Sequence, residues 1–113
     1  MHELPVTENI FKLVLAKATE NNAKKVHSIT IRMGEGCDFV PEIIEEYLQI
    51  FAEGTVIKGA KIIPDIIPTT IKCLECGGQF KKDLYMYNCP KCGSDRLRPE
   101  IKSDLIVSSI EME

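Results

Sequence analysis

The sequence has 113 residues, of which 44% are apolar and 27% are charged, and its net charge at pH 7 is −3. This length fits one domain, or one domain with a small insertion, and excludes a large two-domain enzyme. The acidic balance argues against general binding to nucleic-acid phosphates, which depends on lysine and arginine. No apolar run reaches the roughly 18 residues that a membrane span needs, and acidic Glu3 and Glu8 stand where a signal peptide would be basic. We therefore expect a cytoplasmic protein without a membrane or nucleic-acid partner.

An amphipathic helix is the first element that the sequence predicts, over residues 4–20. Apolar side chains recur there at roughly helical intervals, and Pro5 suits a first turn, where no amide donor is needed. Asn21 and Asn22 tolerate the left-handed backbone that often follows a helix. Residues 26–33 alternate between apolar and polar, which predicts a half-buried strand.

A second helix is predicted to begin near Pro41 and to end before Gly54, because apolar residues keep helical spacing between them. Residues 55–71 are rich in isoleucine, valine and threonine and predict one or two strands, with a turn or bulge at Gly59. Residues 103–113 predict a last strand. The pattern predicts an α+β fold: two helices packed on a small mixed or antiparallel sheet, with a four-cysteine module like a zinc ribbon inserted between the last two strands.

Four cysteines form two CxxC pairs, Cys73 with Cys76 and Cys89 with Cys92, and a glycine follows each pair. Each pair lets a tight turn direct two sulfurs at one ion, and four thiolates complete the tetrahedron that structural Zn²⁺ favours. Such a closed shell leaves no position for catalysis, so the zinc would serve to fold the segment. Iron in a rubredoxin-like site and a disulfide pair are the alternatives. An odd count of five cysteines and the absence of a signal sequence favour thiols.

The cysteine segment is more basic than the rest of the chain, since residues 69–100 hold six of the fourteen basic residues and four acids. Zinc with four thiolates carries a net charge of about −2. The cations placed to offset this charge are Lys72, Lys81, Lys82, Lys91 and Arg96. Phe80, Tyr85 and Tyr87 lie among them and could stack on bases, so a zinc-ribbon module that binds RNA or protein is the alternative function. We expect these aromatic rings to cover the cysteine pairs instead.

The N-terminus offers a second set of metal donors in Met1, His2 and Glu3. A histidine near a terminus is commonly a solvated side chain. However, the α-amine, the amide nitrogens of residues 2 and 3 and the His2 imidazole can converge on one ion, and nitrogen donors in a plane suit Ni(II) or Cu(II). We expect no metal role for His27, which begins a strand, or for Cys37, which lies in a loop.

Short motifs along the whole chain resemble the HypA/HybF family of hydrogenase nickel-incorporation proteins. They are Met1-His2-Glu3-Leu4, Ala23-Lys24-Lys25-Val26, Met33-Gly34-Glu35, Val40-Pro41-Glu42, Gly54-Thr55 with Gly59-Ala60, and both CxxC pairs. The resemblance runs essentially from end to end. It implies a nickel metallochaperone, not an enzyme.

The resemblance also implies how the chain is divided and where nickel binds. A nickel-binding domain of residues 1–68 and 101–113 would be interrupted by a zinc-binding domain of residues 69–100. Ni²⁺ would be a transient cargo, bound by the Met1 amine, the backbone amides of His2 and Glu3 and the His2 ring. The Glu3 side chain would orient this site or contact a partner.

The implied zinc ligands and partners follow from the same resemblance. Cys73, Cys76, Cys89 and Cys92 match the zinc ligands of the family one by one. The implied partners are the GTPase HypB and the precursor of the [NiFe]-hydrogenase large subunit or its maturation complex. We expect the chain itself to be a monomer or a weak homodimer.

Overall fold

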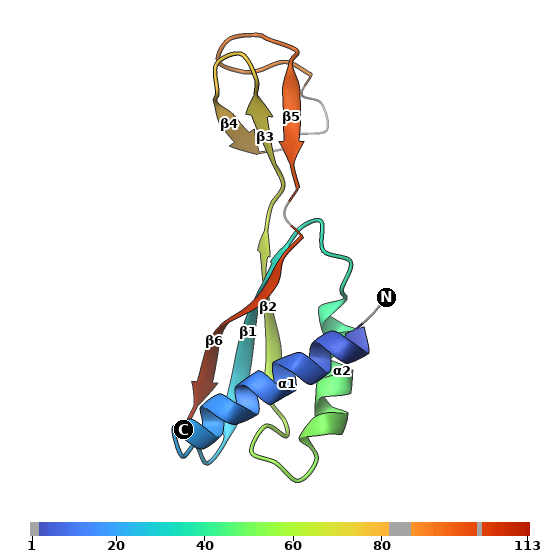
Figure 1. The fold of residues 1–113 in the computed structure, drawn as a ribbon, viewed down its shortest axis with the longest axis vertical. Helices are drawn as coiled ribbons and strands as arrows, with labels where there is room; N and C mark the ends of the chain where they lie inside the picture. Colours follow the sequence, from blue (N-terminus) through green and yellow to red (C-terminus); the bar gives the residue numbers. More distant parts are fainter. Residues whose placement is uncertain (1–2, 82–86, 102) are drawn as a thin grey trace. The chain divides into compact units, whose positions relative to one another are not determined.

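The computed structural model describes residues 3–81, 87–101 and 103–113. Its helices and strands, in chain order, are α1 (Glu3–Glu20), β1 (Val26–Gly34), α2 (Pro41–Ala52), β2 (Lys61–Ile67), β3 (Thr70–Cys73), β4 (Gln79–Lys81), β5 (Leu97–Glu100) and β6 (Leu105–Met112) (Figure 1). The chain forms two compact units. Unit 1 comprises Met1–Arg32, Asp38–Asp65 and Leu105–Glu113, and unit 2 comprises Met33–Cys37 and Ile66–Asp104.

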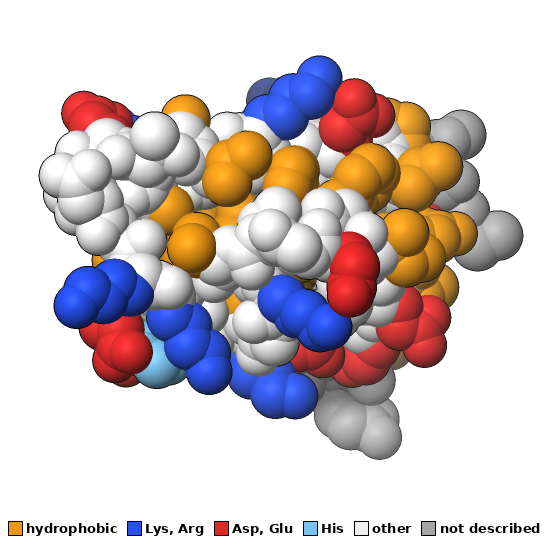
Figure 2. All heavy atoms as spheres, turned by 90° about the horizontal axis from the view of Figure 1, so that it is seen from below, with side chains coloured by type: hydrophobic (Ala, Val, Ile, Leu, Met, Phe, Trp, Pro, Cys, Tyr) orange, Lys and Arg blue, Asp and Glu red, His pale blue; other side chains and the backbone are white. Residues whose placement is uncertain are grey.

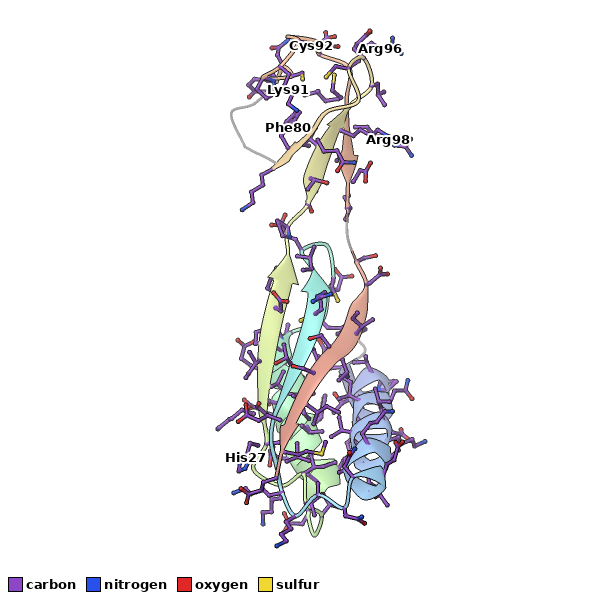
Figure 3. The ribbon with its side chains drawn as sticks, turned by 90° about the vertical axis from the view of Figure 1, so that its left-hand side faces the viewer. His27, Phe80, Lys91, Cys92, Arg96 and Arg98 are labelled. Carbon is purple, nitrogen blue, oxygen red and sulfur yellow. The ribbon has the colours of Figure 1, made fainter. Side chains whose placement is uncertain are left out.

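A three-stranded sheet has the strand order β2-β1-β6. β1 and β2 run in the same direction, and β6 runs in the opposite direction (Figure 3). The N–H of Glu113 donates to the carbonyl of Lys25 at 2.9 Å, and the N–H of Gly34 donates to the carbonyl of Asp104 at 2.9 Å. The end of β6 thus meets the start of β1, as an antiparallel pair requires. The sheet is therefore mixed, and the predicted α+β fold with two helices and a clustered four-cysteine module is confirmed.

Both helices of unit 1 lie on the same face of this sheet (Figure 3). Phe11 of α1 stacks on Phe51 of α2, with ring centroids 5.9 Å apart and planes 28° apart. The core beneath the helices consists of fully or almost fully buried side chains, among them Val14, Ala18, Val26, Ile29, Ile31, Ile44 and Leu48. On the other face, Arg32 and Asp65 are half-exposed and form an ion pair at 3.6 Å. No helix in the described part of the chain is long and apolar enough to cross a membrane.

Local turns determine where the predicted helices and strands end. Asn22 adopts the left-handed conformation expected after α1, with φ of 51°. Residues 55–60 form turns rather than strand, and Gly59 has φ of +84° within them. The Thr55 hydroxyl donates to the carbonyl of Ala52 at 2.7 Å and accepts the N–H of Ile57 at 3.1 Å. These hydrogen bonds tie the turn to the end of α2, so strand β2 begins later than the composition alone suggests.

Unit 2 contains a second, antiparallel sheet with the strand order β4-β3-β5. Ile71 of β3 lies opposite Phe80 of β4 and Pro99 of β5, and Cys73 lies opposite Leu97. Because side chains two residues apart on a strand share a face, these five form one small layer. The sheet holds Cys73 at the end of that layer, where its side chain is fully buried.

Candidate metal centre

A tight turn with two backbone hydrogen bonds carries the first cysteine pair. The N–H of Gly77 donates to the carbonyl of Cys73 at 3.0 Å, and the N–H of Cys73 donates to the carbonyl of Gly78 at 2.9 Å. The amide of Cys76 also points toward the Cys73 sulfur, with nitrogen and sulfur 3.5 Å apart. The turn therefore presents both sulfurs of the pair on one side.

The second cysteine pair repeats this turn. The N–H of Gly93 donates to the carbonyl of Cys89 at 2.8 Å, and the N–H of Cys89 donates to the carbonyl of Ser94 at 2.7 Å. Gly77 and Gly93 occupy the same place in the two turns and have φ of 76° and 78°. This backbone conformation is costly for residues with a Cβ atom, which explains the glycine after each pair.

The four sulfurs form a compact cluster. The Cys73 and Cys92 sulfurs are 3.6 Å apart, the Cys76 and Cys89 sulfurs are 3.7 Å apart, and all four lie within 4.8 Å of one another. A tetrahedral ion with bonds of about 2.3 Å to sulfur separates its ligands by about 3.8 Å. The sulfur pairs are far longer than a disulfide bond of about 2.0 Å, and all four cysteines are free thiols. The cluster fits one tetrahedral metal ion.

The backbone around the cluster favours ionised thiols. A hydrogen bond from the amide of Cys76 lowers the pKa of Cys73, against the effect of burial. A hydrogen bond from the amide of Cys92 lowers the pKa of Cys89 to about 6. The amide of Ser94 lowers the pKa of Cys92, but the neighbouring Cys73 sulfur and burial outweigh it and raise that pKa to about 12. A divalent cation at the centre would favour the thiolate at every position.

The first cysteine of each pair is buried and the second is exposed. Beside the cluster, a Cβ atom built on Gly78 would lie 3.4 Å from the Cys76 sulfur and 3.8 Å from Lys91 Nζ. Gly78 thus lies close to both the Cys76 sulfur and the Lys91 ammonium. Arg96 Nη1 pairs with Glu75 Oε1 at 3.0 Å and links the chain after the second pair to the first turn. Because both groups are half-exposed or more, this ion pair adds little stability of its own.

Of the predicted nickel ligands, Glu3 is the first residue of α1. Met1 and His2 are outside the described residues. Glu3 is 4% exposed, and its carboxylate accepts the N–H of Val40 at 3.2 Å. The carbonyl of Glu3 accepts the hydroxyl of Thr7, which is fully buried. One carboxylate oxygen and the carbonyl oxygen of Glu3 are thus engaged within unit 1, whereas the amide nitrogen of a first helical residue has no partner inside the helix.

In the sequence, Val40 stands out only as part of the Val40-Pro41-Glu42 motif, and Thr7 carries no signal of a role. The one local signal is that α2 begins after Val40, whose side chain cannot cap a helix, and no side-chain cap forms there. That missing cap indicates an acceptor elsewhere in the chain, but it does not identify Glu3, 37 residues away.

His27 and Cys37, for which no metal role was expected, are not members of the cysteine cluster. His27 Nε2 is 3.1 Å from a carboxylate oxygen of Glu113, and Cys37 is a partly buried free thiol. Within the described residues, the four cysteines are the sole group of three or more potential ligands close enough to share an ion. Of the aromatic residues that were expected to cover the cysteine pairs, Phe80 is partly buried, whereas Tyr87 is 76% exposed and does not form a buried cover. Tyr85 lies outside the described residues.

Comparisons with known proteins agree with the family resemblance over the whole chain. Residues 1–112 match the family model described as "Hydrogenase/urease nickel incorporation, metallochaperone, hypA". The chain belongs to the HypA family. It is 31% identical to the hydrogenase maturation factor HypA of Caldanaerobacter subterraneus subsp. tengcongensis, over 100% of both chains. It is 33% identical to the hydrogenase maturation factor HypA of Aquifex aeolicus, over 100% of this chain and 98% of the other.

Two solved structures confirm the HypA fold. The solution structure of the Ni metallochaperone HypA from Helicobacter pylori has a TM-score of 0.61 at 24% identity and covers 99% of this chain and 97% of the other. A second solution structure of a HypA protein has a TM-score of 0.71 at 24% identity and covers 100% of this chain and 97% of the other. The HypA family consists of metallochaperones for nickel incorporation in hydrogenase maturation, not of enzymes. The predicted family and the non-enzymatic class are thereby confirmed.

Proposed function

We propose that this chain binds Ni²⁺ at its N-terminus and delivers it, together with the GTPase HypB, for insertion into the precursor of the [NiFe]-hydrogenase large subunit. The observation that carries this proposal is the match to the HypA family over residues 1–112. We assign nickel binding to unit 1, which contains the N-terminus, and zinc binding to unit 2, which contains the four cysteines.

The proposed nickel ligands are the Met1 amine, the amide nitrogens of His2 and Glu3 and the His2 imidazole. The environment of Glu3 supports this set, because its carboxylate and carbonyl already have partners and its amide nitrogen has none within the helix. Nitrogen donors in a plane favour Ni(II) or Cu(II) over zinc. A terminal site with few ligands also suits transfer better than a buried cage, since the ion must leave.

The proposed role of the four-cysteine cluster is structural zinc binding. The matched turns and the sulfur separations of 3.6 and 3.7 Å support it. Four thiolates leave no open position on a tetrahedral ion, so the site has no place for a reactant. Metal analysis of the purified protein distinguishes zinc from iron, which would also colour the protein red.

The decisive experiment is a nickel titration of zinc-loaded protein with its native N-terminus. A copy that carries one extra glycine before Met1 is the matched control, because it keeps every side chain and moves the α-amine. We expect the native protein to bind one nickel ion and the extended copy to lose this binding. Equal binding by both, or binding by neither, would contradict the terminal site.

The pH dependence of nickel binding tests the same ligands. Protons compete for the amine and the imidazole, whose ordinary pKa values are about 7.7–8.0 and 6.5. Nickel affinity should therefore fall as the pH drops below roughly 7. A titration in which nickel affinity is unchanged between mildly acidic and mildly basic buffer would exclude this donor set.

A further inference from the structure

The sheet of unit 2 has two faces of different character. Cys73 and Phe80 belong to the apolar layer on one face. Because neighbouring positions on a strand point to opposite sides, the positions between them form the other face. The residues of this second face, the basic face, are Thr70 and Lys72 of β3, Gln79 and Lys81 of β4, and Arg98 and Glu100 of β5.

Arg96 and Leu74 extend the basic face beyond the paired strands. The N–H of Leu74 donates to the carbonyl of Arg96 at 2.8 Å, which continues the antiparallel register of β3 and β5. Arg96 is two positions from Arg98, and both side chains project to the same side of unit 2 (Figure 3). Leu74 is 51% exposed. An exposed leucine therefore lies beside a row of two arginines.

The cations of the basic face have few acidic partners. Among the described residues, no carboxylate forms an ion pair with Lys72, Lys81 or Arg98, whereas Arg96 pairs with Glu75. The charge of the cysteine cluster does not account for the first three cations, because strand alternation places them on the face opposite to the buried cysteine of β3. They are free to bind an acidic partner.

Cations of unit 1 commonly have acidic partners within the chain. Figure 2 shows basic and acidic side chains beside one another on one face of the molecule. Lys12, Lys17, Arg32 and Lys58 each pair with a carboxylate at 3.0–3.6 Å. The shortage of such partners on the basic face of unit 2 is therefore a local feature and not a property of the whole surface.

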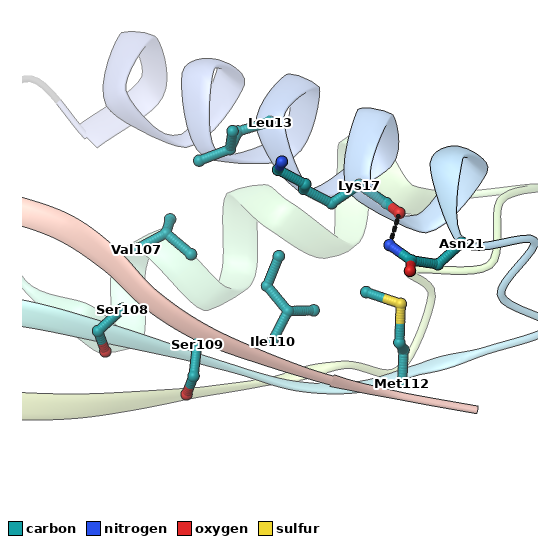
Figure 4. A pocket seen from close by; sticks show the side chains of 8 residues that line it. All are labelled: Leu13, Lys17, Asn21, Val107, Ser108, Ser109, Ile110 and Met112. Carbon is teal, nitrogen blue, oxygen red and sulfur yellow. Dashed lines mark hydrogen bonds between the residues drawn. The ribbon is translucent and has the colours of Figure 1, made fainter.

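A hollow of about 380 Å³ between α1 and β6 has an apolar character instead. Leu13, Val107 and Ile110 are among its lining residues, and the one cation that lines it, Lys17, pairs with Glu20 at 3.6 Å (Figure 4). The lining residues give no preference for a charged ligand. The basic face is thus the surface that can select a partner by charge.

We propose that the basic face binds an extended acidic segment of a partner protein, with carboxylates at alternate positions of the segment. Such side chains are about 6.4–6.8 Å apart on an extended chain, and Arg96 and Arg98 share this spacing because they too are two positions apart. A guanidinium can bind a carboxylate through two parallel hydrogen bonds. An apolar residue of the segment packs on Leu74. This interaction does not depend on the nickel site.

Pro99 determines how the segment binds. Edge strand β5 has the sequence LRPE, and its proline lacks the amide donor that a further strand would need. Addition of a strand to this edge is therefore unfavourable. The segment binds through its side chains, across the basic face rather than along the edge of the sheet.

An acidic protein segment fits this face better than RNA. Single-stranded RNA is held largely by bases that stack on aromatic rings, and Phe80 lies on the opposite face of the sheet. The net charge of −3 also opposes binding of a long phosphate chain. Arginine is enriched at protein interfaces, and Leu74 offers apolar surface that phosphates do not use.

Fluorescence anisotropy with labelled peptides tests the proposal on zinc-loaded full-length protein. The probe is a peptide of about ten residues in which aspartate and valine alternate. The comparison ligands are a peptide of the same composition with its aspartates in one block, the alternating peptide with lysine in place of aspartate, and an oligouridine of similar length. We expect the alternating acidic peptide to bind most tightly and its affinity to fall as salt is added.

Arg98→Ala should weaken binding of the alternating acidic peptide by about two- to fivefold, as for loss of one exposed ion pair. Arg98→Lys keeps the charge and should lose less. Arg32→Ala is the matched control, because Arg32 is also an exposed arginine on a strand but lies in unit 1. It changes the net charge equally and should leave the dissociation constant unchanged. Leu74→Ala should also weaken binding, and zinc analysis shows whether each variant keeps its metal.

Three results would overturn the proposal. Equal losses in Arg98→Ala and Arg32→Ala would mean that the peptide responds only to overall charge. Equal affinity for the alternating and the blocked acidic peptides would exclude the alternate spacing, and tighter binding of oligouridine would make RNA the occupant. Absence of peptide binding up to millimolar concentration would show that the basic face is a solvated surface.

Discussion

The Glu3 carboxylate lies against the backbone of Val40, whose N–H it accepts at 3.2 Å. Val40 is the N-cap residue immediately before α2, and its own side chain provides no cap. A carboxylate near a helix N-terminus interacts favourably with the free amides and with the helix dipole. Glu3, which follows the proposed nickel ligand His2, therefore also stabilises the start of α2.

Substitution of Glu3 tests this contact. Glu3→Ala leaves the Val40 amide without its acceptor in a partly buried place, and we expect a loss of about 1–3 kcal/mol in the free energy of unfolding. Glu3→Gln keeps an acceptor oxygen and should lose less. The control is Glu46→Ala on the exposed face of α2, where a change within about 0.5 kcal/mol is typical. Denaturant unfolding measures all three, and an unchanged Glu3→Ala variant would show that the contact contributes nothing.

Most of the fold could be predicted because it depends on local periodicity. The buried positions of α1 and β1 follow from the spacing of apolar residues, and Asn22 and Gly59 adopt the positive φ values that mark the predicted turns. The extent of β2 could not be predicted, because Thr55 makes hydrogen bonds that only the folded turn allows. The position of β6 at the edge of the sheet could not be predicted either, since strand order depends on long-range pairing.

The candidate metal centre, too, could be predicted from the sequence only in part. The clustering of the four cysteines follows from their spacing, because each CxxC pair is a local turn and two such turns complete a tetrahedron. The hydrogen bond between Glu3 and Val40 joins residues 37 positions apart, and no periodic pattern encodes it. The ligand assignments at Met1 and His2 come from the family resemblance and remain a proposal.

Removal of the metal should unfold unit 2 and leave unit 1 folded. In residues 66–104, the described residues that are buried are Thr69, Cys73 and Cys89, so little apolar burial supports this segment. Structural zinc contributes about 10–16 kcal/mol of apparent binding energy in small modules of this kind. Two-dimensional NMR before and after chelation measures the effect. Signals of β3, β4 and β5 should collapse to unfolded positions while those of α1 and α2 persist, and simultaneous loss of both sets would contradict the prediction.

Zinc binding should release protons and weaken at low pH. Near neutral pH the Cys89 thiol, with its pKa lowered to about 6, is already largely ionised, whereas Cys92, with its pKa raised to about 12, still holds its proton. Zinc binding displaces the Cys92 proton, whereas Cys89 has already lost most of its own. Binding should therefore release fewer protons than the four thiols could supply. As the pH falls through about 6, protonation of Cys89 adds to the competition and zinc affinity should drop more steeply. Calorimetry in buffers of different ionisation enthalpy counts the protons; release of none near neutral pH would exclude the assignment.

The glycines of the two turns should differ in their tolerance of a side chain. Gly77 and Gly93 have φ of 76° and 78°, and a Cβ atom at either would meet no other atom within 4 Å, so the cost of Gly77→Ala or Gly93→Ala comes from the backbone alone. A left-handed residue with a Cβ costs about 1–2 kcal/mol, which predicts zinc binding weaker by roughly five- to thirtyfold. Gly78→Ala is the matched control, because Gly78 lacks a positive φ and its Cβ would make ordinary contacts at 3.4 Å. Competition with a chelator of known affinity measures the three dissociation constants. An equal loss of affinity in all three variants would mean that the space around the turns, rather than their left-handed backbone, requires glycine.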